Sequence, residues 1–257
     1  MMFDTILYEK KDGIATIALN RTNVLNAMNR RLWTELQEAL DDAHKDGDIK
    51  VVILTGKGRA FSTGADLKES RTRSAEQYRE YLEALQRVSR DIIRYDKPTI
   101  AAINGYALGS GYELALACDI RIASETALIG SPEAKVASSV TGGAFRLVQQ
   151  LVGPGKAKEL LFTARNIDGK EAERIGLVNK AVPPDQLMDE AMQMAANIAA
   201  NNLFSLKMIK RGLHLGQGET SLEALMDFEV EACLACVATR ERVSALDDFE
   251  KRKDPKK

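Results

Sequence analysis

The strongest constraint on the fold of this chain is a repeated alternation of strand-like runs with helix-like runs between residues 51 and 182. The run Val-Val-Ile-Leu at residues 51–54 is continuous and apolar, which is typical of a strand covered on both faces. Strands that alternate with helices in this way predict a layered α/β fold, in which right-handed crossovers join parallel strands.

The individual elements follow from periodicity and turn signals. Two alternating runs across residues 6–20 flank Asp12-Gly13, and this dipeptide favours the tight turn of a β-hairpin. Apolar residues at helical spacing predict a helix from about residue 28 to residue 47. Farther along, we expect helices at residues 74–95 and 110–118, and strands at residues 98–107, 119–123, 127–129 and 177–182.

The pattern changes after Pro183-Pro184, where the strand-like runs stop. We expect only helices beyond this point, at residues 185–201, 203–215, 221–239 and 240–251. The sequence therefore predicts an α/β domain over residues 1–184 and a helical region over residues 185–257. A mixed apolar stripe that includes Leu222 and Cys233 predicts that these helices either cap the first domain or pack against another subunit.

Charge and cysteine content narrow the classes of function. The chain has 36 Lys and Arg against 37 Asp and Glu, so no field of a single sign steers it onto nucleic acid or a membrane, and we expect a small substrate. Three cysteines are too few for a disulfide scaffold, which favours the cytoplasm. We find neither a signal-peptide pattern nor a run of roughly 18 apolar residues, so we expect no membrane insertion.

Two segments rich in small residues follow predicted strands. Residues 59–68 follow the strand-like run that ends at Thr55-Gly56, and α/β sheets bind ligands in loops at such strand ends. The N–H groups of this segment can point at an anionic oxygen, or the segment is an ordinary turn. Residues 104–114 pass through a glycine-rich turn into a helix, whose N-terminus can stabilise an oxyanion. Neither segment matches a dinucleotide or phosphate-loop motif.

A serine nucleophile and a metal centre are both disfavoured. Ser110 lies at a strand-to-helix turn, but a nucleophile elbow needs glycine where Leu108 stands. The two histidines, His44 and His214, fall in helical segments, and we expect surface or packing roles for them. The Cys233-x-x-Cys236 pair has neither a second pair nor nearby histidines, so we expect no metal site.

Two carboxylates stand in apolar surroundings. Glu113 begins the helix after the glycine-rich turn and precedes Leu-Ala-Leu-Ala, while Glu133 follows Ser131-Pro132 at the end of a strand. A helix-capping role is the simplest interpretation of Glu113 alone. In a chain with 37 acidic residues, two glutamates indicate no function by themselves.

Taken together, these segments resemble the crotonase superfamily, the enoyl-CoA hydratase/isomerase family, along nearly the whole chain. The resemblance is carried by motifs in family order: Leu19-Asn20-Arg21, Leu25-Asn26-Ala27-Met28, residues 60–68, residues 104–109, Cys118-Asp119, Ser131-Pro132-Glu133, Gly176-Leu177-Val178 and Phe249-Glu250-Lys251-Arg252. It implies a spiral of ββα turns with the active site in residues 1–184, and a helical C-terminal trimerisation region that commonly gives a dimer of trimers. The implied substrate is an acyl-CoA thioester, with no further cofactor.

The resemblance also implies roles for individual residues. The backbone N–H groups of Ala65 and Ser110 would form an oxyanion hole, and Glu113 and Glu133 would be the catalytic carboxyl groups. The implied residues at the substrate and its CoA part are Val24, Leu25, Ala27, Ala60, Gly64, Asp66, Leu67, Lys68 and Gly109. Two departures stand out, because Ser110 replaces the usual glycine and the loop over residues 134–143 is one residue shorter than in typical hydratases.

The leading interpretation is an enoyl-CoA hydratase of fatty-acid or related acyl-CoA degradation. Syn addition of water to an α,β-unsaturated thioester needs a base for the water and a proton for Cα, which two carboxyl groups supply. One of them must stay protonated near neutral pH, so burial or a neighbouring charge must raise its pKa. The alternatives are a double-bond isomerase, a specialised dehydratase, a CoA-thioester hydrolase and a non-catalytic scaffold with the same fold.

Overall fold

The structure is a computed structural model that describes residues 2–70, 75–136, 138–218 and 231. The chain divides into two compact units, with the boundary between Ile198 and Ala199. All the strands described belong to the first unit. Among the described residues, no helix is both long enough and apolar enough to cross a membrane.

The fold opens with the expected β-hairpin. Strands β1 (Ile6–Lys11) and β2 (Ile14–Leu19) pair antiparallel around Asp12 and Gly13. Both turn residues have positive φ, 51° and 78°, as a two-residue turn that follows the twist of its strands requires. Helix α1 (Arg30–Lys45) then leads to strand β3 (Val51–Gly56), which lies parallel to β2. The hairpin and the helix predicted from the sequence are confirmed.

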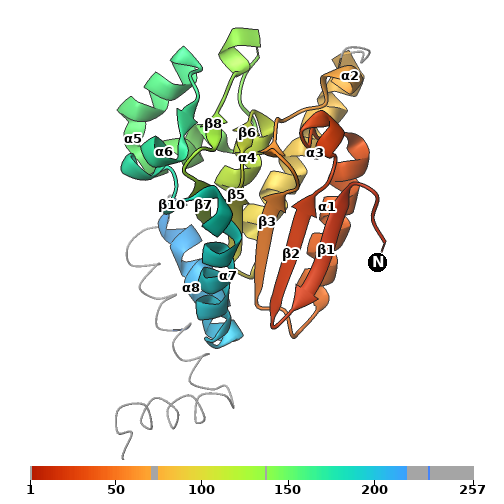
Figure 1. Ribbon diagram of the computed structural model, residues 1–257, viewed down its shortest axis with the longest axis vertical. Helices are drawn as coiled ribbons and strands as arrows, with labels where there is room; N and C mark the ends of the chain where they lie inside the picture. The colour runs from red at the N-terminus through yellow and green to blue at the C-terminus, as the bar shows by residue number, and fades with distance from the viewer. Residues whose placement is uncertain (1, 71–74, 137, 219–230, 232–257) are drawn as a thin grey trace, which may run out of the picture. The chain divides into compact units, whose positions relative to one another are not determined.

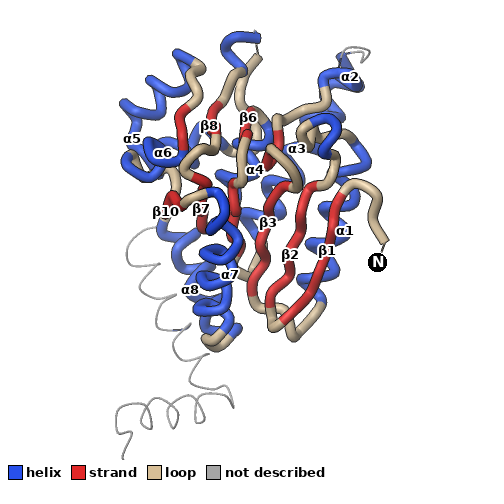
Figure 2. The backbone as a smooth tube through the Cα atoms, in the orientation of Figure 1, coloured by secondary structure: helices blue, strands red, loops and turns tan. Residues whose placement is uncertain are grey.

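Three successive ββα turns follow, and they confirm the predicted spiral. The first strand of each turn joins a six-stranded sheet of order β1-β2-β3-β5-β7-β10, and the second joins a four-stranded sheet of order β4-β6-β8-β9. The elements after β3 are β4 (Ala60–Ser62), α2 (Leu67–Ser70), α3 (Ala75–Arg94), β5 (Thr99–Ile103), β6 (Tyr106–Leu108), α4 (Ser110–Ala117), β7 (Ile120–Ser124), β8 (Leu128–Gly130), a 3-10 turn at Glu133–Val136 and α5 (Ala144–Thr163). The strands of both sheets are visible in Figure 2.

The single strand predicted at residues 98–107 is wrong, because the chain changes sheets in the middle of it. Strand β5 ends at Ile103, and β6 begins at Tyr106 in the other sheet. A Cβ atom at Gly105 would lie 2.1 Å from the carbonyl oxygen of Arg59. Only glycine permits this corner, because any side chain would collide with the backbone. The residues on both sides of the corner are apolar, so their pattern predicted one continuous strand.

The remaining elements close the first unit. They are β9 (Ile167–Asp168), α6 (Gly169–Arg174), β10 (Lys180–Val182), a 3-10 turn at Pro184–Gln186 and α7 (Leu187–Ala199). Strand β10 is shorter than the predicted strand at 177–182, because residues 177 and 178 donate their N–H groups to Ala172 at the end of α6. Strands β4 and β9, of three and two residues, are too short to leave a pattern in the sequence.

Helices cover the sheet and hold the core. Helices α1 and α3 lie behind strands β1–β3 in the view of Figure 1, and α1 contacts β1, β2 and α3. Leu32, Leu36 and Leu40 of α1 are buried, which is the apolar stripe that predicted the helix. All eight residues of α4 are buried, so the N-terminus of this helix opens inside the molecule and not at its surface.

The second unit contains helix α8 (Leu203–Gly216), close to the predicted 203–215. It begins after Asn202, whose side chain accepts a hydrogen bond from the N–H of Ser205, as is typical of an N-cap. The helices predicted at residues 221–239 and 240–251, with Leu222, Cys233 and Cys236, lie outside the described residues.

Candidate active site

Two loops approach each other at the carboxyl ends of β4 and β6. A Cβ atom at Gly64 would lie 2.8 Å from the carbonyl oxygen of Leu108 and 3.0 Å from the nitrogen of Ser110. Within the described part of the chain, no hydrogen bond uses the N–H of Ala65 or that of Ser110. These two N–H groups therefore remain available to an acceptor from outside the chain.

The first loop is held rigid on both sides of Ala65. The N–H of Met28 donates to the carbonyl oxygen of Gly64 at 2.7 Å, and the N–H of Asp66 donates to that of Met28 at 3.0 Å. The Arg21 guanidinium donates to the Asp66 carboxylate at 2.9 Å. These contacts fix the direction of the Ala65 N–H. In the second loop, the turn depends on Gly109, which has a positive φ of 53°.

Glu113 lies in the first turn of α4 and is only 3% exposed. Thr141 donates to both oxygens of its carboxylate, through the backbone N–H at 2.5 Å and the hydroxyl at 2.7 Å. Burial raises the pKa of Glu113, the two Thr141 donors lower it and the charge of Glu133 raises it, with a raised pKa as the net result. Glu113 thus accepts from Thr141 and does not cap its own helix.

Glu133 begins the 3-10 turn after β8. The Ser131 hydroxyl donates to one of its carboxylate oxygens, and the other oxygen lies 2.9 Å from where a Cβ atom at Gly109 would stand. Glycine at position 109 therefore leaves room for this carboxylate directly above the turn that leads to Ser110.

One cavity of about 530 Å³ brings these groups together. Its lining residues are Ala27, Thr63, Ala65, Asp66, Lys68, Tyr81, Leu82, Gly109, Ser110, Glu113, Pro132, Glu133, Val136, Ser138, Ser139 and Thr141. Ala65 and Ser110, with their unused N–H groups, and the carboxyl-bearing Glu113 and Glu133 thus line the same cavity. Backbone N–H groups can stabilise an oxyanion and carboxyl groups can transfer protons, which suits chemistry next to a carbonyl group.

The structure brings most of the sequence-predicted residues to this cavity, but not all. Both predicted carboxylates and both predicted N–H donors line it, as do Ala27, Asp66, Lys68 and Gly109. Val24, Leu25, Ala60 and Gly64 are not among the lining residues. Ala60 is fully buried, and Gly64 contributes by its close backbone approach. For Leu67 the structure describes the backbone in α2 and not the side chain.

Several lining residues were missed by sequence reasoning. Thr141, Ser138 and Ser139 belong to the loop over residues 134–143, whose unusual sequence was the available signal. Tyr81 and Leu82 come from α3, and tertiary packing alone brings them to the cavity, so no local pattern could have indicated them.

The other candidates do not join the cavity. His44 lies 3.1 Å from Asp96 and packs against the ring of Tyr95, the packing role expected for it. His214 lies in α8. In residues 2–70, 75–136, 138–218 and 231, no three His, Cys, Asp or Glu side chains are grouped so that they could hold a metal ion.

The fold and the cavity define a class of α/β enzymes built from ββα turns, with backbone donors and carboxyl groups around one substrate space. The chain belongs to the enoyl-CoA hydratase/isomerase family, whose model matches residues 9–256. The predicted family membership is thus confirmed.

Two curated relatives and one solved structure illustrate this membership. The chain is 37% identical to the short-chain-enoyl-CoA hydratase of Clostridium acetobutylicum over 255 residues, 98% of this chain and 97% of that one. It is also 37% identical to the crotonyl-CoA hydratase of Syntrophomonas wolfei, with 98% of each covered. The crystal structure of enoyl-CoA hydratase from Bacillus anthracis superposes with a TM-score of 0.94 at 35% identity, covering 97% of each chain.

Proposed function

We propose that the protein is an enoyl-CoA hydratase, a hydro-lyase that adds water in syn fashion to short α,β-unsaturated acyl-CoA thioesters. The observation that carries the proposal is the meeting of Glu113, Glu133 and the unused N–H groups of Ala65 and Ser110 in one cavity. The names of the two relatives, which match nearly the whole chain, support both the reaction and the short acyl group.

The two N–H groups serve the step in which charge develops. When water adds to Cβ, negative charge moves onto the thioester oxygen as an enolate, and Ala65 and Ser110 donate hydrogen bonds to it. Each such donor is worth roughly 2.7–4 kcal/mol in the transition state. Ser110 is also the first residue of α4, so the partial positive charge of the helix N-terminus acts on the same oxygen.

The two carboxyl groups divide the proton transfers. Glu113 takes a proton from water, because two Thr141 donors orient its carboxylate and its raised pKa makes it a stronger base than an ordinary glutamate. The carboxyl group with the raised pKa is Glu113, so the proton taken from water rests on Glu113 and passes from it, by way of Glu133, to Cα of the enolate. Hydroxide is thus added at Cβ and a proton at Cα, and both carboxyl groups return to their starting state.

No other cofactor enters this scheme, since coenzyme A is part of the substrate and an acid–base addition moves no electrons to an acceptor. We place the CoA phosphates near the exposed Lys57, Arg59 and Lys68, which flank the first loop. A cytoplasmic location, with no membrane or nucleic-acid partner, stays a prediction.

We also propose a homotrimer or a dimer of trimers, with the helical region from residue 185 on as its contact region. Ile209 and Leu213 of α8, 60% and 64% exposed, support the proposal as apolar side chains one turn apart. Light scattering should give three or six times the protomer mass of 28.3 kDa, and a stable, active monomer would contradict it.

Thioester hydrolysis is the second candidate, because Ser110 lines the same cavity and carries a hydroxyl group where the family usually has glycine. One assay separates the two reactions. With crotonyl-CoA we expect loss of the conjugated enoyl absorbance and no release of free thiol. Release of free CoA, above all if Ser110→Ala abolishes it, would favour hydrolysis, and an unchanged enoyl absorbance with no thiol release would overturn the hydratase proposal.

A further inference from the structure

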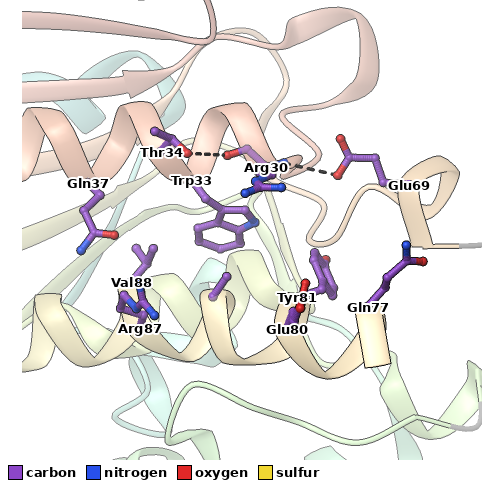
Figure 3. A pocket seen from close by; sticks show the side chains of 11 residues that line it. Arg30, Trp33, Thr34, Gln37, Glu69, Gln77, Glu80, Tyr81, Arg87 and Val88 are labelled. Carbon is purple, nitrogen blue, oxygen red and sulfur yellow. Dashed lines mark hydrogen bonds between the residues drawn. The ribbon is translucent and has the colours of Figure 1, made fainter. Parts of the chain in front are cut away.

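A second cavity shares one lining residue with the active-site cavity. This second cavity, of about 660 Å³, lies between α1 and α3 and is lined by Arg30, Trp33, Thr34, Gln37, Glu69, Gln77, Glu80, Tyr81, Ala84, Arg87 and Val88. Tyr81 is the residue common to the linings of the two cavities. Figure 3 shows its side chain reaching from α3 towards the indole of Trp33 on α1.

The two sides of Tyr81 differ in chemistry. Towards the active site, its neighbours along the lining include Leu82 and Val136, which suit an alkyl group. On the other side the lining carries the charged side chains of Arg30, Glu80 and Arg87. An alkyl chain gains free energy when it leaves water for apolar surroundings, so a short acyl group gains more from the active-site cavity than from the second cavity.

Trp33 adds to the polarity of the second cavity. Its side chain is buried, with 6% of the residue exposed, yet its Nε1–H has no hydrogen-bond partner among the described residues. A buried donor without a partner is unfavourable. The second cavity also has the apolar side chains of Ala84 and Val88 in its lining, which an alkyl chain can contact once the Tyr81 ring is removed.

We propose that Tyr81 is the residue that limits the length of the acyl chain, because its ring closes the acyl pocket against the second cavity. This inference rests on the proposed function, in which the enoyl group lies between Glu113 and Glu133. A four-carbon acyl group ends before the ring, whereas an eight-carbon group meets it. Tyr81 thus acts by exclusion and takes no part in proton transfer.

The test replaces the ring and compares chain lengths. Tyr81→Ala joins the two cavities, and Tyr81→Leu opens the partition in part. Val88→Ala is the matched control, because Val88 is buried and lines the second cavity without lining the first. The readouts are kcat/KM for crotonyl-CoA and 2-octenoyl-CoA, and the Kd values for the saturated butyryl-CoA and octanoyl-CoA, which cannot be hydrated.

We expect the octenoyl-to-crotonyl ratio of kcat/KM to rise about tenfold or more in Tyr81→Ala, a size typical of discrimination by methylene groups. It should rise less in Tyr81→Leu and stay at the wild-type value in Val88→Ala. The ratio of Kd values should shift in the same order. If Tyr81→Ala does not fold, Tyr81→Leu decides alone.

An unchanged ratio in the Tyr81 variants, or an equal rise in Val88→Ala, would overturn the inference. Binding of the saturated esters does not depend on turnover, so it distinguishes failure of the Tyr81 inference from failure of the proposed function. If wild type binds butyryl-CoA but hydrates nothing, the hydratase proposal fails while the Kd ratios still decide on Tyr81. If wild type binds neither ester, both proposals fail.

Discussion

Thr141 donates its backbone N–H and its hydroxyl to the two different oxygens of the Glu113 carboxylate. The threonine belongs to the loop over residues 134–143, which we expect from the sequence to differ from that of typical hydratases. Its neighbour Gly142 has a positive φ of 59° and packs against Glu113 and Ser89 so closely that a Cβ atom would lie 2.8 Å from the serine hydroxyl. The unusual loop therefore supplies the support of the proposed base.

Thr141→Val tests that support, because it removes the hydroxyl and keeps the shape. The hydroxyl lowers the pKa of Glu113, so its loss should raise this pKa further. Since the base must be ionised, the acidic limb of the pH profile of kcat/KM should move to higher pH. Turnover should fall about tenfold or more, because a hydrogen bond to a charged group is worth roughly 1.5–3 kcal/mol.

Thr141→Ser is the control for this change, since it retains the hydroxyl. Its acidic limb should stay at the wild-type position. If the pH profile of kcat/KM for Thr141→Val has the same acidic limb as wild type, the Thr141 hydroxyl does not influence the pKa of Glu113.

Gly64→Ala should disable the oxyanion pair without touching either carboxylate. The new Cβ would lie 2.8 Å from the oxygen of Leu108 and 3.0 Å from the nitrogen of Ser110, at a φ of 91°. The two loops must then separate, and kcat should fall roughly 10²-fold, the loss typical of one oxyanion donor. Gly47→Ala is the matched control, because no atom lies within 4 Å of its added Cβ. Similar kcat values for the two variants would contradict the assignment of Ala65 and Ser110.

The ionised carboxylate of Glu35 should stabilise the folded protein at neutral pH, and this stability should be lost in acid. Burial raises the pKa of Glu35, but hydrogen bonds from Thr5, Arg31 and Asp4 lower it more, to about 2. A depressed carboxylate pKa contributes stability above the unfolded value of about 4.5, and this contribution is lost as pH falls towards 2. It amounts to about 3 kcal/mol.

Glu35→Gln should therefore lower the free energy of unfolding at pH 7 and have much less effect near pH 2. Urea unfolding of both proteins at several pH values measures this difference. A gap between wild type and variant that stays constant from pH 7 to pH 2 would show that ionisation of Glu35 does not carry the stability.

The binding of the CoA part should depend on salt. Lys68 lies on α2 beside the cavity and is exposed, so its attraction to phosphate is screened by ions. The KM for crotonyl-CoA should rise with ionic strength at nearly constant kcat, and less steeply in Lys68→Ala. Lys11→Ala, at an exposed position of the β1–β2 hairpin, is the control with wild-type behaviour. Equal salt dependence in all three proteins would remove Lys68 from the CoA site.

Local signals explain what the sequence alone could predict. Asp12-Gly13 specifies its turn within two residues, and the apolar stripe of α1 predicted that helix. The structure adds an N-cap that was not predicted from the sequence, in which the side chain of Asn29 accepts a hydrogen bond from the N–H of Leu32. Glu113 and Glu133 stand in apolar surroundings, but their catalytic role was predicted from the family resemblance. The turn and the helix need no information from distant parts of the chain.

Features that depend on distant contacts could not be predicted in the same way. The corner at Gly105 exists because the chain packs on the carbonyl of Arg59, 46 residues away in sequence. Thr141 and Tyr81 reach the cavity from a loop and a helix whose local patterns say nothing about Glu113. Periodicity indicates which face of an element is buried, but not against which residue.

The most direct test of the central claim compares the kcat values of Glu113→Gln, Glu133→Gln and the double variant for crotonyl-CoA hydration. Each single change keeps the side-chain shape and removes one proton-transfer group, so kcat should fall more than about 10²-fold while binding of butyryl-CoA stays within a few-fold of wild type. The double variant should lose much less than the product of the two single losses, because the carboxyl groups act as a unit on one water. Near-normal turnover in either single variant would contradict the claim that both carboxyl groups carry the reaction.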